Sequence, residues 1–210
     1  MLITAIRHAE SMGNAGLGGG VNPGLSPKGR EQAKRAAKRL AGERVTHVWS
    51  SPFNRAIATA RAVAAESGAT VELHHEMCEH YIYDDFRDWR CPTGSAILRE
   101  HEGVRLARTF PKGSWTPEFG ESWEAICART ANVARRALAL GRRRARTGRK
   151  THLVVVGHGA SVKALLRSLT GLNIAQDEHY VNAGLSRVRL DGALPGKVIY
   201  LNDAAHLDGL

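Results

Sequence analysis

The sequence lacks the features of several common protein classes. No apolar run approaches the roughly 20 residues that a membrane-spanning helix needs, so we expect no membrane association. The three cysteines, Cys78, Cys91 and Cys127, are odd in number and form no CxxC pair. Reduced thiols are the simplest interpretation of such cysteines, and they favour a cytoplasmic location.

Several nucleotide, hydrolase and metal motifs are also missing. The glycine-rich stretch 16–24 is not followed by Gly-Lys-Ser/Thr and does not satisfy GxGxxG, which excludes a Walker loop and a dinucleotide fingerprint. No Gly-x-Ser-x-Gly elbow is present, and Ser161 carries no nucleophile signature. The His/Glu cluster at 74–80 misses the HExxH spacing. We therefore expect neither a metal ion nor a cofactor.

Positive charge is in excess. The chain has 30 Lys and Arg against 20 Asp and Glu, a formal net charge of +10 that concentrates anions near clefts. Part of this excess lies in the basic run 142–150, which is typical of the exposed C-terminal end of a long helix. No RNP, zinc-finger or KH motif accompanies it, so we expect no nucleic-acid partner.

Apolar strand patterns alternate with helix patterns along the chain. We predict strands at 2–7, 45–50, 70–73, 153–156, 186–190 and 197–201, and helices beginning at Ser26-Pro27, Ser51-Pro52, Ser122 and Ala160. The unbroken apolar run 153–156 is typical of a sheet centre covered on both faces. The alternation predicts a single α/β domain over 1–210, a three-layer α/β/α sandwich with a mainly parallel central sheet.

Residues 75–120 differ in composition and periodicity from the rest of the chain. They hold many aromatic side chains among prolines and mixed charges, with weak periodicity. This composition favours a small inserted cap over a site rather than the interior of the sheet.

Cationic and polar side chains follow the predicted strands. His8 comes directly after strand 2–7, and His158 comes directly after strand 153–156. The carboxyl ends of parallel strands meet at one edge of the sheet, where ligands gather. Arg7 can bind two phosphate oxygens at once. Arg55 lies one turn into the helix that Ser51-Pro52 is predicted to open, so it can point toward the same edge, and Asn14 lies in the loop after His8. Together these five residues predict a phosphate-binding site.

At these residues the sequence resembles the histidine phosphatase superfamily, in its phosphoglycerate mutase-like branch. The resemblance spans nearly the whole chain, through motifs that follow one another in the same order as in the family. In the first half, Arg7-His8-Ala9-Glu10-Ser11-x-x-Asn14 is similar to RHGESxxN, Leu25-Ser26-Pro27-Lys28-Gly29 to LTxxG and Ser50–Ala60 to SSxLxRAxxTA. In the second half, Met77-Cys78-Glu79 is similar to LxE, Gly120-Glu121-Ser122 to GES and Val156–Gly159 to VxHG, while Asn182 with Ser186 loosely resembles the terminal Asn/Ser segment. One departure is Ala9 at the usual glycine of the first motif.

The resemblance implies a role for each candidate residue. His8 would be the nucleophile that forms a phosphohistidine, and Arg7, Arg55 and His158, with Asn14 assisting, would hold the phosphate oxygens. Glu79 would be the proton donor, a role for which a carboxyl group with a raised pKa is needed. Asp84 and Asp85 follow closely enough in the sequence to be alternative donors.

The function implied is that of a metal-independent phosphatase, a phosphoric monoester hydrolase acting on a small phosphorylated metabolite. The alternatives are a phosphoglycerate mutase and a phosphoprotein or phosphohistidine phosphatase, and less favoured is a non-catalytic phosphate-binding module. Mutases of the family are longer, and degenerate members usually lose His8 or its partner. The sequence leaves the physiological substrate and the oligomeric state open.

Overall fold

The computed structural model describes all 210 residues. The seven strands are β1 (Leu2–Arg7), β2 (His47–Ser50), β3 (Val71–Leu73), β4 (Val104–Leu106), β5 (His152–Gly157), β6 (Leu185–Arg189) and β7 (Lys197–Asp203). The five α-helices are α1 (Pro27–Leu40), α2 (Asn54–Ser67), α3 (Gly94–Glu100), α4 (Trp123–Ala145) and α5 (Gly159–Thr170). Short 3-10 turns lie at His75–Met77 (η1), Asp84–Phe86 (η2) and Ala205–Leu207 (η3).

The strands form one sheet in the order β4-β3-β2-β5-β1-β6-β7. Neighbouring strands from β4 to β1 pair in parallel, whereas β6 and β7 are antiparallel to their neighbours. This confirms the predicted α/β class with a mainly parallel sheet.

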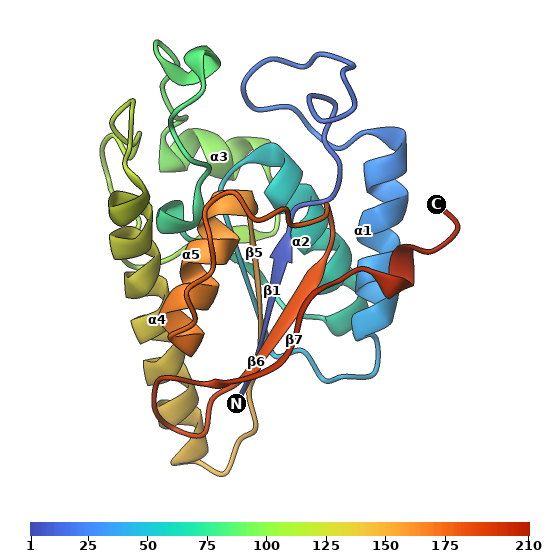
Figure 1. The fold of residues 1–210 in the computed structure, drawn as a ribbon, viewed down its shortest axis with the longest axis vertical. Coiled ribbons are helices and arrows are strands. Elements are labelled where there is room, and N and C mark those ends of the chain that lie inside the picture. The colour runs from blue at the N-terminus through green and yellow to red at the C-terminus, as the bar shows by residue number, and fades with distance from the viewer.

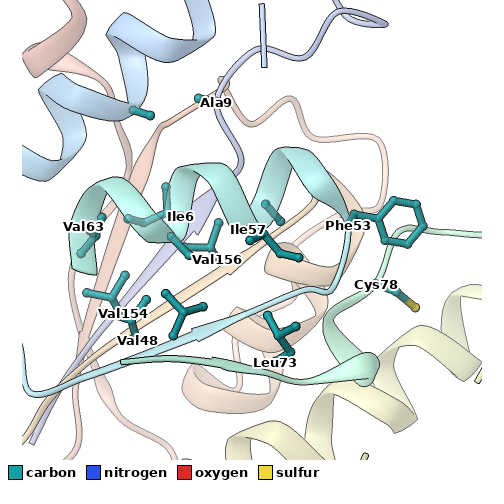
Figure 2. Close-up of a cluster of buried hydrophobic side chains, with 14 of the residues drawn as sticks. Ile6, Ala9, Val48, Phe53, Ile57, Val63, Leu73, Cys78, Val154 and Val156 are labelled. Atoms are coloured by element: carbon teal, nitrogen blue, oxygen red, sulfur yellow. The ribbon is translucent and has the colours of Figure 1, made fainter. Parts of the chain in front are cut away.

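Helices cover both faces of the sheet, α1 and α2 on one and α4 and α5 on the other (Figure 1). Alternate residues of the central strands supply the two apolar layers, as the pleat of a strand requires. Val154 and Val156 belong to the cluster under α1 and α2, which Figure 2 shows together with Ile57 and Val63 of α2. Leu153 and Val155 belong to the cluster under α4 and α5. The central strand β5 is buried along its whole length, as its sequence predicts.

The starts of α1 and α4 agree with the predictions, α5 begins at Gly159 rather than at the predicted Ala160, and α2 begins later than predicted. The Ser26 side chain caps α1 by accepting from the Gly29 amide at 2.9 Å, and Pro27 is its first residue. The prediction that Ser51-Pro52 opens α2 is wrong, because the helix begins at Asn54 with Phe53 at its N-cap. The Ser51 side chain instead faces His158, as described below.

The predicted cap segment, residues 75–120, contains η1, η2, α3 and β4. Its aromatic side chains pack with Phe53 in the cluster under α1 and α2; Tyr81, Phe86, Phe110 and Trp115 are buried there. Strand β4 pairs with β3 at the edge of the sheet, an element that the weak periodicity does not reveal. A capping role for the remainder of the segment stays a prediction. None of the helices combines the length and apolar character of a membrane span.

Candidate active site

The register of the sheet brings three strand ends to one level. Arg7 at the end of β1 is paired with Gly157 at the end of β5, and Ser50 at the end of β2 is paired with Val156. The next residues along the chain are therefore neighbours at the carboxyl edge. The His8 amide donates to the Gly157 carbonyl at 2.8 Å, which extends the β1–β5 ladder by one residue. In Figure 1, β1 points toward this edge, where the loop after His8 and part of the cap segment lie.

His8 is buried, and its hydrogen bonds define its tautomer. Nδ1 lies 2.8 Å from the Ala9 carbonyl oxygen. A carbonyl can only accept, so Nδ1 carries the proton and Nε2 of the neutral ring keeps its lone pair. Arg55 donates from Nε to this Nε2 at 3.2 Å. The unprotonated nitrogen of His8 thus faces a guanidinium group.

The surroundings of His8 favour its neutral form. Burial, followed by the positive charge of Arg55 and the nearby His158, lowers the pKa of His8 well below its usual 6.5. Because only the neutral ring has a nucleophilic nitrogen, His8 is in the reactive form at neutral pH.

His158, the second imidazole, follows β5 and precedes α5. Its Nε2 lies 2.8 Å from Ser51 Oγ, and its ring centroid is 5.0 Å from that of His8. Phe53 packs edge-on against His158 at 5.1 Å and lies under the Arg55 guanidinium at 4.8 Å. Burial, partly opposed by Glu79, lowers the pKa of His158 to about 4, so this ring is also neutral at pH 7.

Glu79 is the carboxylate that the structure brings to the two histidines. It follows β3 and η1, and its Oε2 lies 3.2 Å from His158 Nδ1 and 3.5 Å from Arg55 Nη2. Burial opposes ionisation, but His158, Arg55 and the His80 amide outweigh it and hold the pKa of Glu79 well below 4.5. The expectation of a raised pKa is therefore wrong for the site as it stands: Glu79 is a carboxylate here.

Two buried guanidinium nitrogens complete the site. Arg7 Nε and Arg55 Nη1 have no hydrogen-bond partner in the protein, while Arg7 Nη1 donates to the Tyr180 carbonyl. Buried donors are normally paired, so these two point to an anionic partner. Helix α5 begins at Gly159, directly after His158, and its free amides favour the same charge. The arrangement therefore suits a phosphate group.

Asn14 lies at the margin of the candidate site. It is exposed; its Oδ1 accepts from Ser11 Oγ at 3.0 Å and from Asn182 Nδ2 at 3.3 Å. Asn182 Nδ2 also lies 2.9 Å from the His8 carbonyl oxygen, to which it donates. Asn14 is thus tied to the backbone of His8 rather than to its ring, and its contact with phosphate stays a prediction.

The alternative proton donors are placed differently from Glu79. Asp84 and Asp85 lie in η2, and both are exposed. The Asp84 side chain is 87% exposed and pairs with Arg87 at 2.9 Å. Neither carboxylate shares the contacts that Glu79 makes with His158 and Arg55.

The two histidines and Glu79 also form a possible set of metal ligands. One ligand atom from each of His8, Glu79 and His158 lies within 4.8 Å of the others. However, Arg55 contacts both His8 Nε2 and Glu79 Oε2. A fixed positive charge at this position opposes a metal cation and favours an anion.

The chain belongs to the histidine phosphatase superfamily (branch 1), whose sequence pattern matches residues 3–203. This confirms the family resemblance and, at the level of the family, the predicted enzyme class of phosphoric monoester hydrolase.

Named relatives of the chain include phosphatases and a mutase-like protein. It is 41% identical to phosphoglycerate mutase-like protein 4 of Arabidopsis thaliana over 210 residues, 98% of this chain and 86% of that protein. It is 29% identical to a glucosyl-3-phosphoglycerate phosphatase of Mycolicibacterium vanbaalenii, over 82% of this chain and 75% of that one. The fold matches a phosphoserine phosphatase of Entamoeba histolytica, solved with 3-phosphoglyceric acid, with a TM-score of 0.67 at 21% identity and 98% of each chain covered.

Two residues of the site, Ser51 and Phe53, are not among the predicted site residues. Both contact His158, whereas the sequence predicts a helix start at Ser51. Their signal is their place directly after β2, because the register brings the end of β2 beside the end of β5.

Proposed function

We propose that the protein is a metal-independent phosphomonoesterase that works through a phosphohistidine on His8. The observation that carries this proposal is the tautomer of His8, whose Nε2 lone pair faces the Arg55 guanidinium at 3.2 Å. A nucleophile beside a cation that can hold the phosphoryl oxygens is the arrangement that in-line phosphoryl transfer needs.

The reaction has two steps. In the first, His8 Nε2 attacks phosphorus and the bond from phosphorus to the ester oxygen breaks, while Arg7, Arg55 and His158 bind the non-bridging oxygens. The leaving oxygen takes a proton from Glu79. In the second step, the Glu79 carboxylate removes a proton from water, and the water oxygen attacks phosphorus while the bond from phosphorus to His8 Nε2 breaks. Inorganic phosphate then leaves and His8 is regenerated.

The low pKa of Glu79 suits the second step, in which the residue acts as a base. For the first step Glu79 must gain a proton. A phosphate dianion bound to Arg55 would place negative charge beside Glu79 and engage the cation that now stabilises the carboxylate. Both effects raise the pKa of Glu79. Substrate binding therefore prepares the proton donor.

Small phosphorylated metabolites are the proposed substrates. The relatives suggest a first panel of phosphoserine, 3-phosphoglycerate and glucosyl-3-phosphoglycerate. One relative is a glucosyl-3-phosphoglycerate phosphatase, and one is a phosphoserine phosphatase that was solved with 3-phosphoglyceric acid. The 41% identity to a phosphoglycerate mutase-like protein keeps mutase chemistry as the second candidate. Formation of 2-phosphoglycerate from 3-phosphoglycerate distinguishes a mutase from an enzyme that releases phosphate.

The test uses purified protein with p-nitrophenyl phosphate in EDTA, and samples quenched in alkaline denaturant and then analysed for phosphate bound to histidine. We expect turnover in EDTA and an acid-labile phosphoenzyme that disappears in the His8→Ala variant. Phosphate binding without turnover or phosphoenzyme would instead support a non-catalytic phosphate-binding module. Hydrolysis of phosphopeptides in preference to the metabolite panel would support a phosphoprotein phosphatase. The cytoplasmic location stays a prediction.

A further inference from the structure

The segment that carries Glu79 is held through its backbone carbonyls. Four consecutive residues, 76–79, each have a carbonyl oxygen that accepts a hydrogen bond from a side chain elsewhere in the fold. Arg129 of α4 supplies three of these bonds and Ser161 of α5 supplies the fourth. Only the 3-10 turn η1 gives this segment regular structure. Without the side chains, these inward-facing carbonyls would lack partners.

Arg129 is the centre of this arrangement. Its Nη1 donates to the carbonyls of Glu76 at 2.5 Å and Cys78 at 3.0 Å, and its Nη2 donates to the carbonyl of Glu79 at 3.0 Å. The Glu121 carboxylate binds the other side of the guanidinium, at 2.6 Å to Nε and 2.9 Å to Nη2. The five N–H groups of an arginine can make these contacts with three carbonyls and one carboxylate at the same time, and a lysine cannot reproduce this geometry.

Glu121 and Ser161 connect this arrangement to the rest of the site. The Glu121 backbone carbonyl lies 2.6 Å from Nε2 of His80, the residue whose amide binds the Glu79 carboxylate at 3.0 Å. Ser161 Oγ donates to the Met77 carbonyl at 3.0 Å and accepts from the His158 amide at the same distance. The Glu79 segment is therefore tied directly to the residue that holds His158.

We propose that Arg129, oriented by Glu121, is a positioning residue that sets the place of the Glu79 carboxylate relative to the leaving oxygen. The inference rests on the proposed role of Glu79 as proton donor. Every polar contact of Arg129 is with a backbone carbonyl or with Glu121, so it does not touch the reacting atoms. A displacement of about 1 Å at a catalytic group can lower the rate about a hundredfold. Arg129 thus acts on the rate through the steps in which Glu79 transfers a proton, and the first of these depends on the leaving group.

The test compares two substrates in variants with and without Glu79. The variants are Arg129→Lys and Glu79→Gln, singly and together, with Arg135→Lys as the control on the exposed part of the same helix. The substrates are p-nitrophenyl phosphate, whose leaving group needs little protonation, and the best alkyl phosphate of the metabolite panel. We expect Arg129→Lys to lower kcat/KM for the alkyl phosphate about tenfold or more and kcat/KM for the aryl phosphate less than about threefold, because kcat/KM reports the step in which the leaving group departs. Inhibition by inorganic phosphate should stay within about twofold.

The double variant isolates the connection between the two residues. In the Glu79→Gln background, Arg129→Lys should change the alkyl phosphate rate less than about twofold, because the group that it positions is no longer an acid. Equal losses for both substrates, or losses that multiply in the double variant, would overturn the proposal. If Glu79→Gln itself shows no leaving-group dependence, the proton-donor role fails and the positioning role fails with it. Should Arg129→Lys not fold by circular dichroism, Glu121→Gln takes its place with the same expected pattern.

Discussion

Arg55 donates from Nε to His8 Nε2 at 3.2 Å, while its Nη2 lies 3.5 Å from Glu79 Oε2. One guanidinium thus contacts both the proposed nucleophile and the carboxylate of the candidate site. Both contacts must loosen when a phosphoryl group reaches His8, because the lone pair is needed for attack and the guanidinium for the oxygens. We infer that Arg55 moves from these two side chains onto the phosphate as the substrate binds.

Replacement of Arg55 by lysine tests this relationship. A lysine has the charge but cannot present two parallel N–H groups to a phosphate. We expect Arg55→Lys to lower kcat/KM for p-nitrophenyl phosphate about a hundredfold or more. Arg61→Lys, an exposed change on the same helix, should stay within about twofold of wild type. A loss of less than about threefold for Arg55→Lys would show that charge alone suffices at this position.

Substitution of Glu79 tests the choice of proton donor. Glu79→Gln should lower kcat/KM for alkyl phosphates about a hundredfold or more and kcat/KM for p-nitrophenyl phosphate less than about tenfold, because a poor leaving group needs the proton more. Steady-state rates on the two substrates measure the difference. The variants Asp84→Asn and Asp85→Asn should behave like wild type. If either aspartate variant shows the selective loss instead, the donor lies on η2.

The pH profile tests the ionisation of the two histidines. The pKa of His8 is lowered well below 6.5 and that of His158 to about 4, so protonation of either ring begins only as the pH falls far below neutrality. We expect kcat/KM for p-nitrophenyl phosphate to lose less than about twofold between about pH 7 and about pH 6. A histidine with an ordinary pKa of about 6.5 would be about three-quarters protonated at the lower value, and the rate would fall about threefold. Such a loss would contradict the neutral His8.

The same pH profile also tests the ionisation of Glu79, for which a lower pH should favour the proposed reactive form. Because the pKa of this carboxyl is lowered, the group is ionised near neutral pH, and its protonated fraction grows as the pH falls. The rate for an alkyl phosphate relative to the aryl phosphate should therefore rise toward acid pH, and this rise should vanish in Glu79→Gln. A constant ratio in the wild type would place the transferred proton elsewhere.

Ser51 holds the imidazole that is proposed to bind the phosphate. Removal of its hydroxyl in Ser51→Ala deletes the 2.8 Å contact with His158 Nε2. A buried hydrogen bond of this kind contributes about 1 kcal/mol, so we expect kcat/KM to fall about fivefold. The matched control is Ser50→Ala, because Ser50 Oγ donates to the Ser51 carbonyl and not to a histidine. An equal effect of both changes would indicate a general loss of stability.

The sequence could predict the residues that strand periodicity and motif spacing place at strand ends. His8 and His158 follow clear apolar strands, and the parallel arrangement then requires them to share one edge. The start of α2 and the strand β4 could not be predicted, since both depend on tertiary contacts: Ser51 faces His158, and β4 is a three-residue strand that pairs only with β3. The pKa of Glu79 was beyond prediction for the same reason, because Arg55 and His158 lie far from it along the chain.

Gly29 shows how the first helix supports the loop after His8. A Cβ at this position would lie 1.9 Å from the Glu10 carbonyl oxygen, a distance that no rearrangement of a side chain can relieve. The same stretch is held by Ser26, whose hydroxyl donates to the Glu10 carboxylate at 2.6 Å. We expect Gly29→Ala to lower the free energy of unfolding by about 3 kcal/mol, measured by urea denaturation, because backbone must move. Gly24→Ala, where a Cβ meets open space, should change it by less than about 0.5 kcal/mol. Equal stabilities of the two variants would show that the contact between α1 and the loop is easily displaced.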